Sequence, residues 1–497
     1  MRAAWYERLS VLDYSFLAFE GPSSYMHIAA VAVFEGDPLT TKDGGIDIAQ
    51  IRHYIASRLE SIPRYRQRLA YIPVENHPVW VDDDHFDLAY HVRHTSLPRP
   101  GSDPQLRELC ARLLERPLNR AKPLWEIWVI EGLADGRFAL LMKVHHCMVD
   151  GLGGVELLAA LLRPTAEVSI EAPTEWRPRP APSNAQLLRD ELSRRTKMSI
   201  ELVRRLGRGG NRDDSDWGRS LAAVWELVRE GLRRPVATPL NPRIGPHRRF
   251  HWASCDLAAL KDVKNQLGGT VNDIVLSVVS GAVRAFFERR GFTADGVDFR
   301  VAVPVNVRAA AEQHATGNRV SAWLVSLPIH ERRPLRRLLA VQEMSRHFKE
   351  TNQAIGGRML TQAAEWTSTN VLTLAALLSS RVQPFNLIVT NVPGPQLPLY
   401  LLGARMAAIY PQVPLFENQA LGIALFSYDG KLFWGFNADW DALPDIEAFV
   451  QAIETSFRGL RRAAQRRRAA VSATARTPRP TPRSRPMPSA ATYAASA

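Results

Sequence analysis

The chain has 497 residues, which is too many for one compact core and indicates two domains. Its hydrophobic content of 46% and charged content of 23% are typical of a globular protein and exclude a fibrous or wholly disordered one. The net charge of +13 does not mark a nucleic-acid-binding body, because ten arginines lie between residues 458 and 485 and no acidic residue follows Glu454.

Residues 1–163 are predicted to form a first α/β unit. Alternating or continuous apolar residues predict its strands, and apolar residues at helical spacing predict its helices. A turn at Asp135-Gly136 is predicted to join the last two strands into a hairpin. We expect strands at 26–35, 124–130 and 138–144, and helices at 48–59, 104–114 and 152–162.

Residues 164–235 are predicted to be a helical crossover between the two domains. The stretch 173–182 is rich in proline and favours an extended linker. Two helices with charged faces are expected after it, at 184–206 and 217–232, with a glycine-rich loop between them.

A second α/β unit is predicted over residues 236–465. It contains a hairpin around Asp429-Gly430 and ends in a closing helix. The remaining residues, 466–497, are rich in arginine, proline, serine and alanine and are predicted to be a disordered basic tail. We expect helices at 271–287 and 446–464, and strands at 299–304, 318–327, 385–390, 420–428 and 431–438.

The most informative motif is the segment 145–151, which reads H-H-C-M-V-D-G. It lies between a predicted strand and a predicted helix, so a histidine at the strand end would be held on a rigid scaffold. Because neighbouring residues of a strand face opposite sides, we predict that His146 points into a cleft and that His145 turns away. Histidine titrates near neutrality, and His146 is therefore our candidate general base for deprotonating an alcohol or amine.

Other interpretations of this motif stay open at this point. The two histidines could be satisfied core residues. A zinc site formed by His145, His146 and Asp150 is disfavoured, because adjacent strand histidines diverge and no further ligand cluster lies nearby, and we predict no metal. Cys147 is interpreted as a small buried thiol rather than a nucleophile. Asp150 is predicted to orient the loop, and Gly151 to permit its tight turn.

Polar residues at element ends in the second unit are further candidates. Asn272 and Asp273 begin the predicted helix 271–287, where capping alone would explain them. Asn391 follows a predicted strand and begins N-V-P-G-P, where turn chemistry is an equally good explanation. Together they could face His146 across a cleft, and we name Asn272, Asp273 and Asn391 as candidates for substrate binding or for stabilising an oxyanion.

With these segments, the chain resembles the bacterial wax ester synthase/diacylglycerol acyltransferase family over about residues 9–460. The H-H-x-x-x-D-G motif alone is shared by all CoA-dependent acyltransferases of the chloramphenicol acetyltransferase fold, including carnitine acyltransferases and peptide-synthetase condensation domains. The finer resemblance rests on segments that follow in the family's order: Leu12–Leu17 with Met26-His27, Pro117-Leu118 with Pro123–Glu126, Thr238–Asn241 with Gly245–Arg249, Asn272-Asp273, Pro304–Arg308, Gly317-Asn318 and Asn391–Pro395. Cys147 stands where alanine is common and Thr390 where serine is common, and neither departure removes a chemical group on which the interpretation depends.

The resemblance implies an α/β fold of two chloramphenicol acetyltransferase-like lobes, with the active site and a tunnel between them. Acyl-CoA would enter from one side as a co-substrate and the lipid alcohol from the other, and no bound cofactor is implied. His146 Nε2 would deprotonate the acceptor hydroxyl, and the alkoxide would attack the thioester directly, without a covalent acyl-enzyme. The implied activity is esterification of diacylglycerol, or of a long-chain fatty alcohol, to triacylglycerol or wax ester.

Two other functions stay open at this point. One is a different H-H-x-x-x-D-G acyltransferase that uses a carrier-bound acyl donor, and the other is a catalytically inactive lipid-binding protein of the same fold. The cysteine usage and the lack of an evident signal peptide or membrane span favour a cytoplasmic protein. Peripheral binding to the inner face of the plasma membrane or to a lipid droplet is an alternative to a freely dissolved enzyme, and no nucleic-acid partner is expected.

Overall fold

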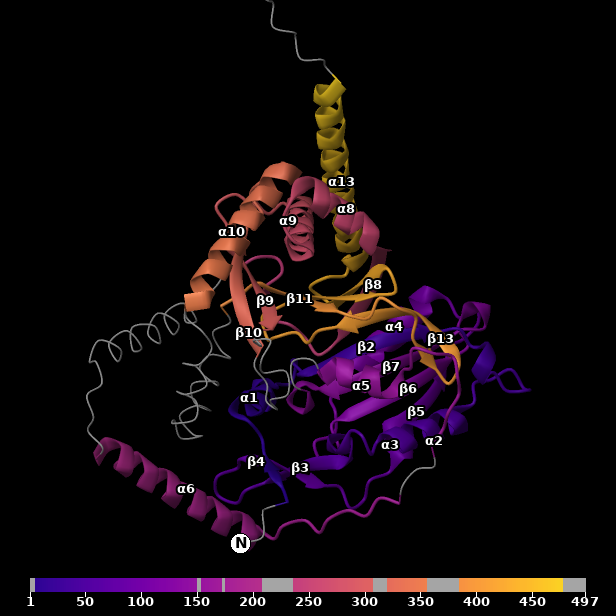
Figure 1. The fold of residues 1–497 in the computed structure, drawn as a ribbon, viewed down its shortest axis with the longest axis vertical. Helices are drawn as coiled ribbons and strands as arrows, with labels where there is room; N and C mark the ends of the chain where they lie inside the picture. Colours follow the sequence, from indigo (N-terminus) through magenta and orange to yellow (C-terminus); the bar gives the residue numbers. More distant parts are fainter. Residues whose placement is uncertain are drawn as a thin grey trace, which may run out of the picture.

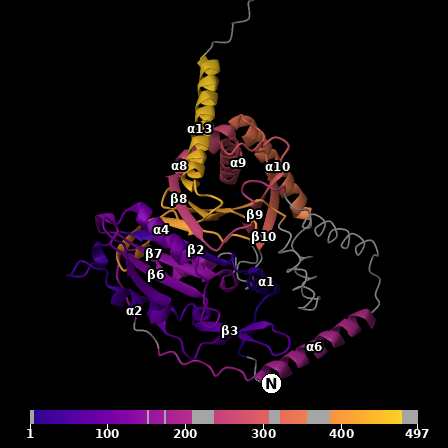
Figure 2. The same ribbon diagram turned by 180° about the vertical axis from the view of Figure 1, so that it is seen from behind.

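The computed structural model describes residues 5–149, 153–171, 175–207, 236–306, 320–354 and 384–476. Figure 1 shows these residues as two lobes, each built on a β-sheet with associated helices, and Figure 2 shows the same lobes from behind. The described residues form two six-stranded sheets and one three-stranded sheet. The α/β class and the two-lobed architecture predicted from the sequence are therefore confirmed.

The first lobe is built on a sheet in which β7 lies between β2 and β6. β6 and β7 are antiparallel, and Asp135 and Gly136 in their connection have φ values of 61° and 66°, the left-handed conformation that Asp-Gly turns favour. The strand order is β12-β13-β2-β7-β6-β5, with β2 His27–Phe34, β5 Val92–Ser96, β6 Trp125–Glu131, β7 Phe138–His145, β12 Tyr400–Leu401 and β13 Ala404–Gln412. The helices are α1 Val11–Phe19, α2 Ile48–Arg58, α3 Leu88–His91, α4 Asp103–Leu114 and α5 Gly153–Leu161.

Strand β7 is buried on both faces, and its side chains alternate between two cores. Its even-numbered residues pack in a core with α2 and α5, whereas Ala139 and Leu141 pack against α4. Lys143, which belongs to the second set, reaches the carbonyl group of Leu113 at the end of α4. This period of two determines which side of the sheet each residue at the end of β7 can reach.

The first sheet is completed by strands from a late part of the sequence. β13 pairs antiparallel with β2, with Gln412 opposite Ala29, and β12 pairs with β13 at the sheet edge. Sequence analysis assigned this stretch to the second unit, 236–465, and predicted no strand in it. Its side chains alternate between buried and exposed only in part, and periodicity cannot identify the sheet that a strand joins. The two lobes are therefore not two separate stretches of chain.

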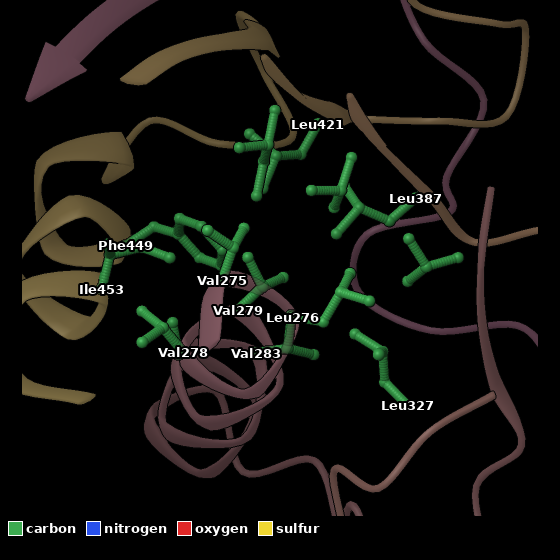
Figure 3. Close-up of a cluster of buried hydrophobic side chains, with 14 of the residues drawn as sticks. Val275, Leu276, Val278, Val279, Val283, Leu327, Leu387, Leu421, Phe449 and Ile453 are labelled. Atoms are coloured by element: carbon green, nitrogen blue, oxygen red, sulfur yellow. The ribbon is translucent and has the colours of Figure 1, made fainter. Parts of the chain in front are cut away.

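The second lobe is built on the sheet β10-β9-β11-β14-β15-β8, against which α9 packs. Figure 3 shows apolar side chains of α9, among them Val275, Val279 and Val283, gathered with Leu421 and Phe449. These side chains are fully buried, and each contributes roughly 1.5–3 kcal/mol to folding. The strands are β8 Arg248–Asp256, β9 Phe299–Asn306, β10 Val320–Leu327, β11 Leu387–Pro393, β14 Leu421–Tyr428 and β15 Lys431–Asp439, and the helices are α8 Leu257–Leu267, α9 Val271–Arg289, α10 Pro334–Ala354 and α13 Ile446–Arg476.

Helix α13 is longer than the sequence analysis predicted. The prediction ended the helix at residue 464 and placed disorder from 466, whereas the helix continues through residues 466–476. That part of the prediction was wrong because arginine and alanine are among the best helix formers, and no proline interrupts them before Pro478. The predicted helix 217–232 and the tail residues 477–497 lie outside the described residues.

A small sheet, β1-β4-β3, lies beside the first lobe and holds one end of α6 (Figure 1). Leu187 of α6 is buried in a cluster with Ile72, Val79 and Val81 of this sheet and its turn. The elements are β1 Glu7–Arg8, β3 Gln67–Tyr71, β4 Pro78–Asp82 and α6 Asn184–Gly207. The helix predicted at 184–206 is therefore confirmed to within one residue.

Candidate active site

Helix α1 packs against the motif that begins at the end of β7. The helix is capped by Ser10, whose Oγ accepts a hydrogen bond from the Asp13 amide at 3.1 Å. Two turns into this helix, the Phe16 ring stacks on the His146 ring, with 3.8 Å between centroids and 18° between planes. The position of α1 therefore fixes one face of the His146 imidazole.

His145 is buried and its ring is held from both sides. Its Nδ1 accepts a hydrogen bond from the Cys147 amide at 3.1 Å, and its own amide donates to Leu124 at 2.9 Å. Because Nδ1 is an acceptor, the proton of a neutral ring lies on Nε2. That Nε2 is 3.2 Å from Glu20 Oε1, which is ion-pair distance, although the angle falls outside hydrogen-bond limits. His145 is thus turned into the protein by its neighbours.

Glu20, the C-cap residue of α1, joins the two histidines to the start of β2. Its Oε1 accepts a hydrogen bond from the Met26 amide at 2.9 Å, and its Oε2 accepts one from Arg120 at 2.6 Å. Burial raises the pKa of this carboxyl group, but His145, Arg120 and the Met26 amide together outweigh burial and lower the pKa to about 2. Glu20 is therefore an anion at every physiological pH.

His146 lies in a different environment from its neighbour. Its amide donates to the Met26 carbonyl at 2.8 Å, so the backbone of Met26 contacts both Glu20 and His146. The side chain is partly exposed, and Nδ1 is the ring nitrogen that is buried without a partner among the described residues. Burial lowers the pKa of His146 to about 4, against the opposing effect of its own backbone carbonyl. The imidazole is therefore neutral at pH 7 and able to accept a proton.

The other residues of the motif are only partly described. Cys147 is buried and free of disulfide bonding, and burial raises the pKa of its thiol well above the ordinary value. A thiol of this kind is not a thiolate at neutral pH, as expected for a structural cysteine. Asp150 and Gly151, which we predicted to orient and shape the loop, lie outside the described residues, and α5 is described from Gly153.

Asn272 and Asp273 lie in the first turn of α9. Asp273 is buried and forms a capping box with Thr270: its Oδ2 accepts from the Thr270 amide at 2.7 Å and from the Thr270 hydroxyl at 2.9 Å. Capping therefore accounts for Asp273, the alternative that the sequence analysis left open. Asn272 is partly exposed, and among the described residues neither side chain bonds to His145 or His146.

Asn391 lies near the end of β11, paired with Leu425 of β14. The next residue, Val392, packs against the core of the first lobe, which contains Met148 and Val149 just after the histidine pair. Val392 is also paired with Phe426 of β14, which belongs to the same core, so the end of β11 reaches the boundary between the lobes. The side chain of Asn391 is partly exposed.

The segment between α1 and β2 also contacts the second lobe. The Ser24 hydroxyl donates to the Leu415 carbonyl at 2.6 Å, and the Phe19 ring meets Phe416 edge-on at 6.0 Å between centroids. The segment that includes Glu20 and Met26 is therefore in contact with both lobes, so the histidine pair lies near the junction between them.

Sequence reasoning missed Glu20 and Arg120, and it cited Phe16 only as part of a family segment. A single acidic residue after a short helix has no periodicity or spacing that would distinguish it from a solvated side chain. Its importance becomes visible only when the fold brings Glu20 to Arg120 and His145, which lie 100 and 125 residues further along the chain.

A metal at the histidine pair is disfavoured by the contacts of His145. Its two ring nitrogens are already directed at the Cys147 amide and at Glu20. Among the described residues, the group with metal-ligand spacing is Asp83, Asp84 and His85, and the last two of these are exposed. The prediction that the site uses no metal stays a prediction.

Two family models match the chain. The wax ester synthase/diacylglycerol acyltransferase catalytic domain matches residues 9–275, and the WS/DGAT C-terminal domain matches residues 316–461. A curated protein of Mycobacterium tuberculosis, described as "Probable diacyglycerol O-acyltransferase tgs1", is 33% identical over 482 residues, which cover 93% of this chain and 99% of that protein.

Solved structures share the fold. The wax ester synthase/diacylglycerol acyltransferase from Marinobacter aquaeolei VT8 has a TM-score of 0.66 and 24% identity, over 92% of this chain and 100% of that chain. A mutant starter condensation domain of rhizomide synthetase RzmA, in complex with C8-CoA and Leu-SNAC, has a TM-score of 0.56 and 16% identity, over 93% and 94% of the two chains. From the two family models and the curated relative, the chain belongs to the wax ester synthase/diacylglycerol acyltransferase family of enzymes.

Proposed function

We propose that this enzyme transfers a fatty acyl group from acyl-CoA to the hydroxyl of diacylglycerol, with long-chain fatty alcohol as a second acceptor. The observation that carries the proposal is a histidine kept neutral by burial, His146, whose ring remains partly exposed at the junction of two lobes. Family membership and the name of the curated relative support the reaction class. The product would be triacylglycerol or a wax ester.

The proposed reaction is a direct transfer. His146 Nε2 takes the proton of the acceptor hydroxyl, and the resulting alkoxide oxygen forms a bond to the thioester carbonyl carbon. The tetrahedral intermediate collapses by breaking the carbon–sulfur bond, and the departing CoA thiolate receives the proton from His146. No acyl-enzyme is needed, and the raised pKa of the buried Cys147 thiol argues against one.

Nε2 can act as the base only if the neutral ring carries its proton on Nδ1. We propose this tautomer because Nδ1 is the buried ring nitrogen, which leaves Nε2 for the substrate. We assign Glu20 and His145 as positioning residues. Glu20 accepts a hydrogen bond from the Met26 amide, and His145 accepts one from the Cys147 amide. Neither residue touches the substrate in this mechanism.

The oxyanion of the intermediate needs a hydrogen-bond donor where its charge develops. We favour Asn391 for this role over Asn272, because the end of β11 packs against the first-lobe core, to which the segment after the histidine pair also belongs. Asp273 is better explained as a capping residue, and Asp150 and Gly151 keep their proposed roles in shaping the loop.

Acyl-CoA is the proposed acyl donor, and no resident cofactor is proposed. A condensation domain with this fold has been solved with C8-CoA, so the fold accommodates such a molecule in that protein. The same likeness keeps a carrier-bound acyl donor as the second candidate. We propose that residues 1–163 and 236–465 supply the lobes, with β12 and β13 of the second stretch completing the first sheet. Residues 164–235 would cross between the lobes, and donor and acceptor would enter a shared tunnel from opposite sides.

We further propose that the enzyme works at the surface of a membrane or lipid droplet, because its acceptor and product are insoluble in water. Within the described ranges, no single helix has the length and apolar composition to cross a membrane. α8 and α9 meet these criteria only as a pair bent by 96°.

The test is a product assay with the full-length enzyme. Palmitoyl-CoA is supplied with diacylglycerol and with hexadecanol in separate reactions, and both CoA release and ester formation are measured. Release that depends on an acceptor supports the proposal and identifies the acceptor class. Activity with a carrier-bound acyl donor alone would establish the second candidate, and no turnover with any donor would favour a lipid-binding protein.

A further inference from the structure

Large apolar side chains are exposed together at one place on the molecule. The turn between β3 and β4 exposes Val74 almost completely, at 95%, and α6 exposes Leu192 at 58%. Leu188 and Ile200, four residues before Leu192 and eight after it, are also exposed, a spacing that keeps one side of the helix apolar. We refer to the side chains of Val74, Leu188, Leu192 and Ile200 as the α6 surface.

The α6 surface is held in place from behind. Leu187 is buried in the cluster formed with β4, so the exposed leucines belong to a docked part of the helix. Arg195 forms an ion pair with Glu75, the residue after Val74, at 3.1 Å, and a second one with Glu191 at 2.9 Å. Burial raises the pKa of Glu191, but hydrogen bonds from arginines outweigh it and lower the pKa to about 2. These pairs fix α6 against the β3–β4 turn.

The backbone conformation of Val74 is a second observation that indicates an apolar partner for this turn. It is a β-branched residue with a φ of 70°, a left-handed conformation that such residues rarely adopt. The fold therefore places a valine in an unfavourable backbone conformation and buries almost none of its side chain. A partner that covers the valine would provide the burial that the fold does not.

The charge of α6 indicates the nature of this partner. The helix carries six basic and three acidic residues, and Arg189 and Lys197 are interspersed with the exposed apolar residues. Basic residues beside an apolar stripe are the composition of helices that lie in the interface of an anionic membrane. The exposed end of α13 is also basic, but residues 461–470 are only alanine, arginine and glutamine, which offer little apolar area to insert.

We propose that the α6 surface docks the enzyme onto an anionic lipid membrane, with Leu188, Leu192 and Val74 in the interfacial layer. This inference rests on the proposed function, since an enzyme that esterifies a lipid alcohol must reach that alcohol in its own phase. The docked side of α6 and the ion pairs with Glu75 stay within the protein, and the basic residues contact lipid headgroups.

The experiment measures sedimentation of the full-length protein with vesicles of phosphatidylcholine and phosphatidylglycerol, and with vesicles of phosphatidylcholine alone. The test variant combines Leu188→Asp and Leu192→Asp. The matched control is Leu339→Asp, because Leu339 is a similarly exposed leucine of α10, at 50%. We expect the double variant to bind anionic vesicles at least about ten-fold more weakly than the wild type, and the control to bind like the wild type.

Three results would overturn the inference. The first is a double variant that binds like the wild type, and the second is a loss of binding as large in the control. The third is a change of oligomeric state in the double variant, seen by light scattering, which would make this face a contact between copies of the chain. An added variant with Arg466, Arg467 and Arg468 changed to Glu shows whether the end of α13 binds instead.

The proposed function fails independently of this inference. CoA release with a short, water-soluble alcohol needs no vesicle, so its presence in the wild type and in the double variant shows that both are folded and active. If wild-type turnover is absent with every acceptor, the proposed function is wrong whatever the vesicles show. If turnover is normal and binding is unaffected by the leucine changes, only the docking surface is wrong.

Discussion

The two adjacent histidines at the end of β7, His145 and His146, lie in different environments. On one side, His145 is buried, with its ring nitrogens directed at the Cys147 amide and at Glu20. On the other side, His146 is stacked on Phe16 and partly exposed, with a pKa lowered to about 4 by burial. The difference arises where the strand ends, because His145 is the last residue of β7 and His146 begins the 3-10 turn His146–Met148.

The largest expected effect on turnover comes from removing the imidazole of His146. We expect His146→Ala to lower kcat by about 10³-fold, because a general base contributes roughly 10²–10⁴-fold. The variant should fold normally, since the ring of His146 donates no hydrogen bond to the rest of the described chain. CoA release and thermal unfolding are measured together. A stable variant with near wild-type turnover would remove His146 as the base.

The second prediction extends the comparison to the other lobe. If Asn391 stabilises the oxyanion, Asn391→Ala lowers kcat by about 10²-fold and leaves KM nearly unchanged, because the lost interaction forms only in the transition state. Asn272→Ala is the matched control and should have a much smaller effect. Equal losses in the two variants, or a loss only in Asn272→Ala, would reverse the assignment.

The third prediction concerns the structural side. Glu20→Gln removes the charge that faces His145 and Arg120 while keeping the shape of the side chain. We expect a loss of about 1–3 kcal/mol in the free energy of unfolding and a fall in kcat of about ten-fold through displacement of the His146 backbone. Exposed Glu35→Gln is the control. A variant with full stability and full turnover would show that Glu20 positions nothing.

The pH dependence of stability gives a sharper test of Glu20. Its pKa in the folded protein is about 2, below the ordinary value of 4.5. A lowered carboxyl pKa contributes stability that is present above the ordinary pKa and is lost as the pH falls from about 4.5 toward 2. Urea unfolding across this range should therefore show a smaller loss of stability in Glu20→Gln than in the wild type.

The smallest expected effect is that of the ring that covers His146. Phe16→Ala exposes the imidazole and should raise its pKa from about 4 toward the ordinary 6.5, with a fall in kcat of only a few-fold at pH 8. Phe16→Leu keeps an apolar cover and is the control. The His146 pKa is followed by NMR titration, and an unchanged pKa in Phe16→Ala would mean that other residues bury the ring.

Local patterns predicted much of the scaffold. The strands around 138–144 and 421–428, the Asp135-Gly136 turn and the helix 184–206 follow from periodicity and turn chemistry, which are properties of neighbouring residues. The addition of β13 to the first sheet did not follow, because pairing between Gln412 and Ala29 joins positions far apart in the chain. Helix α13 ends at Arg476 and not at the predicted residue 464, because composition alone does not distinguish a basic helix from a basic disordered tail.

The site divides in the same way. His146 and His145 were predicted from one short motif. The expected alternation along a strand does not apply to His146, because β7 ends at His145 and His146 begins a 3-10 turn. Glu20 was not predicted, since its role depends on Arg120 and His145 being brought to it by the fold. Asp273 was a candidate whose capping contacts with Thr270 became visible only with the side chains in place.

The measurement that tests the central claim most directly is the pH dependence of kcat/KM for acceptor-dependent CoA release. A lowered histidine pKa leaves the base neutral, and hence active, at every pH above that value. The account predicts that kcat/KM falls on the acidic side with an apparent pKa near 4, and that the residual activity of His146→Ala lacks this limb. A limb near 6.5, or the same limb in His146→Ala, would contradict the claim that His146 is a general base whose pKa is lowered so that it stays neutral.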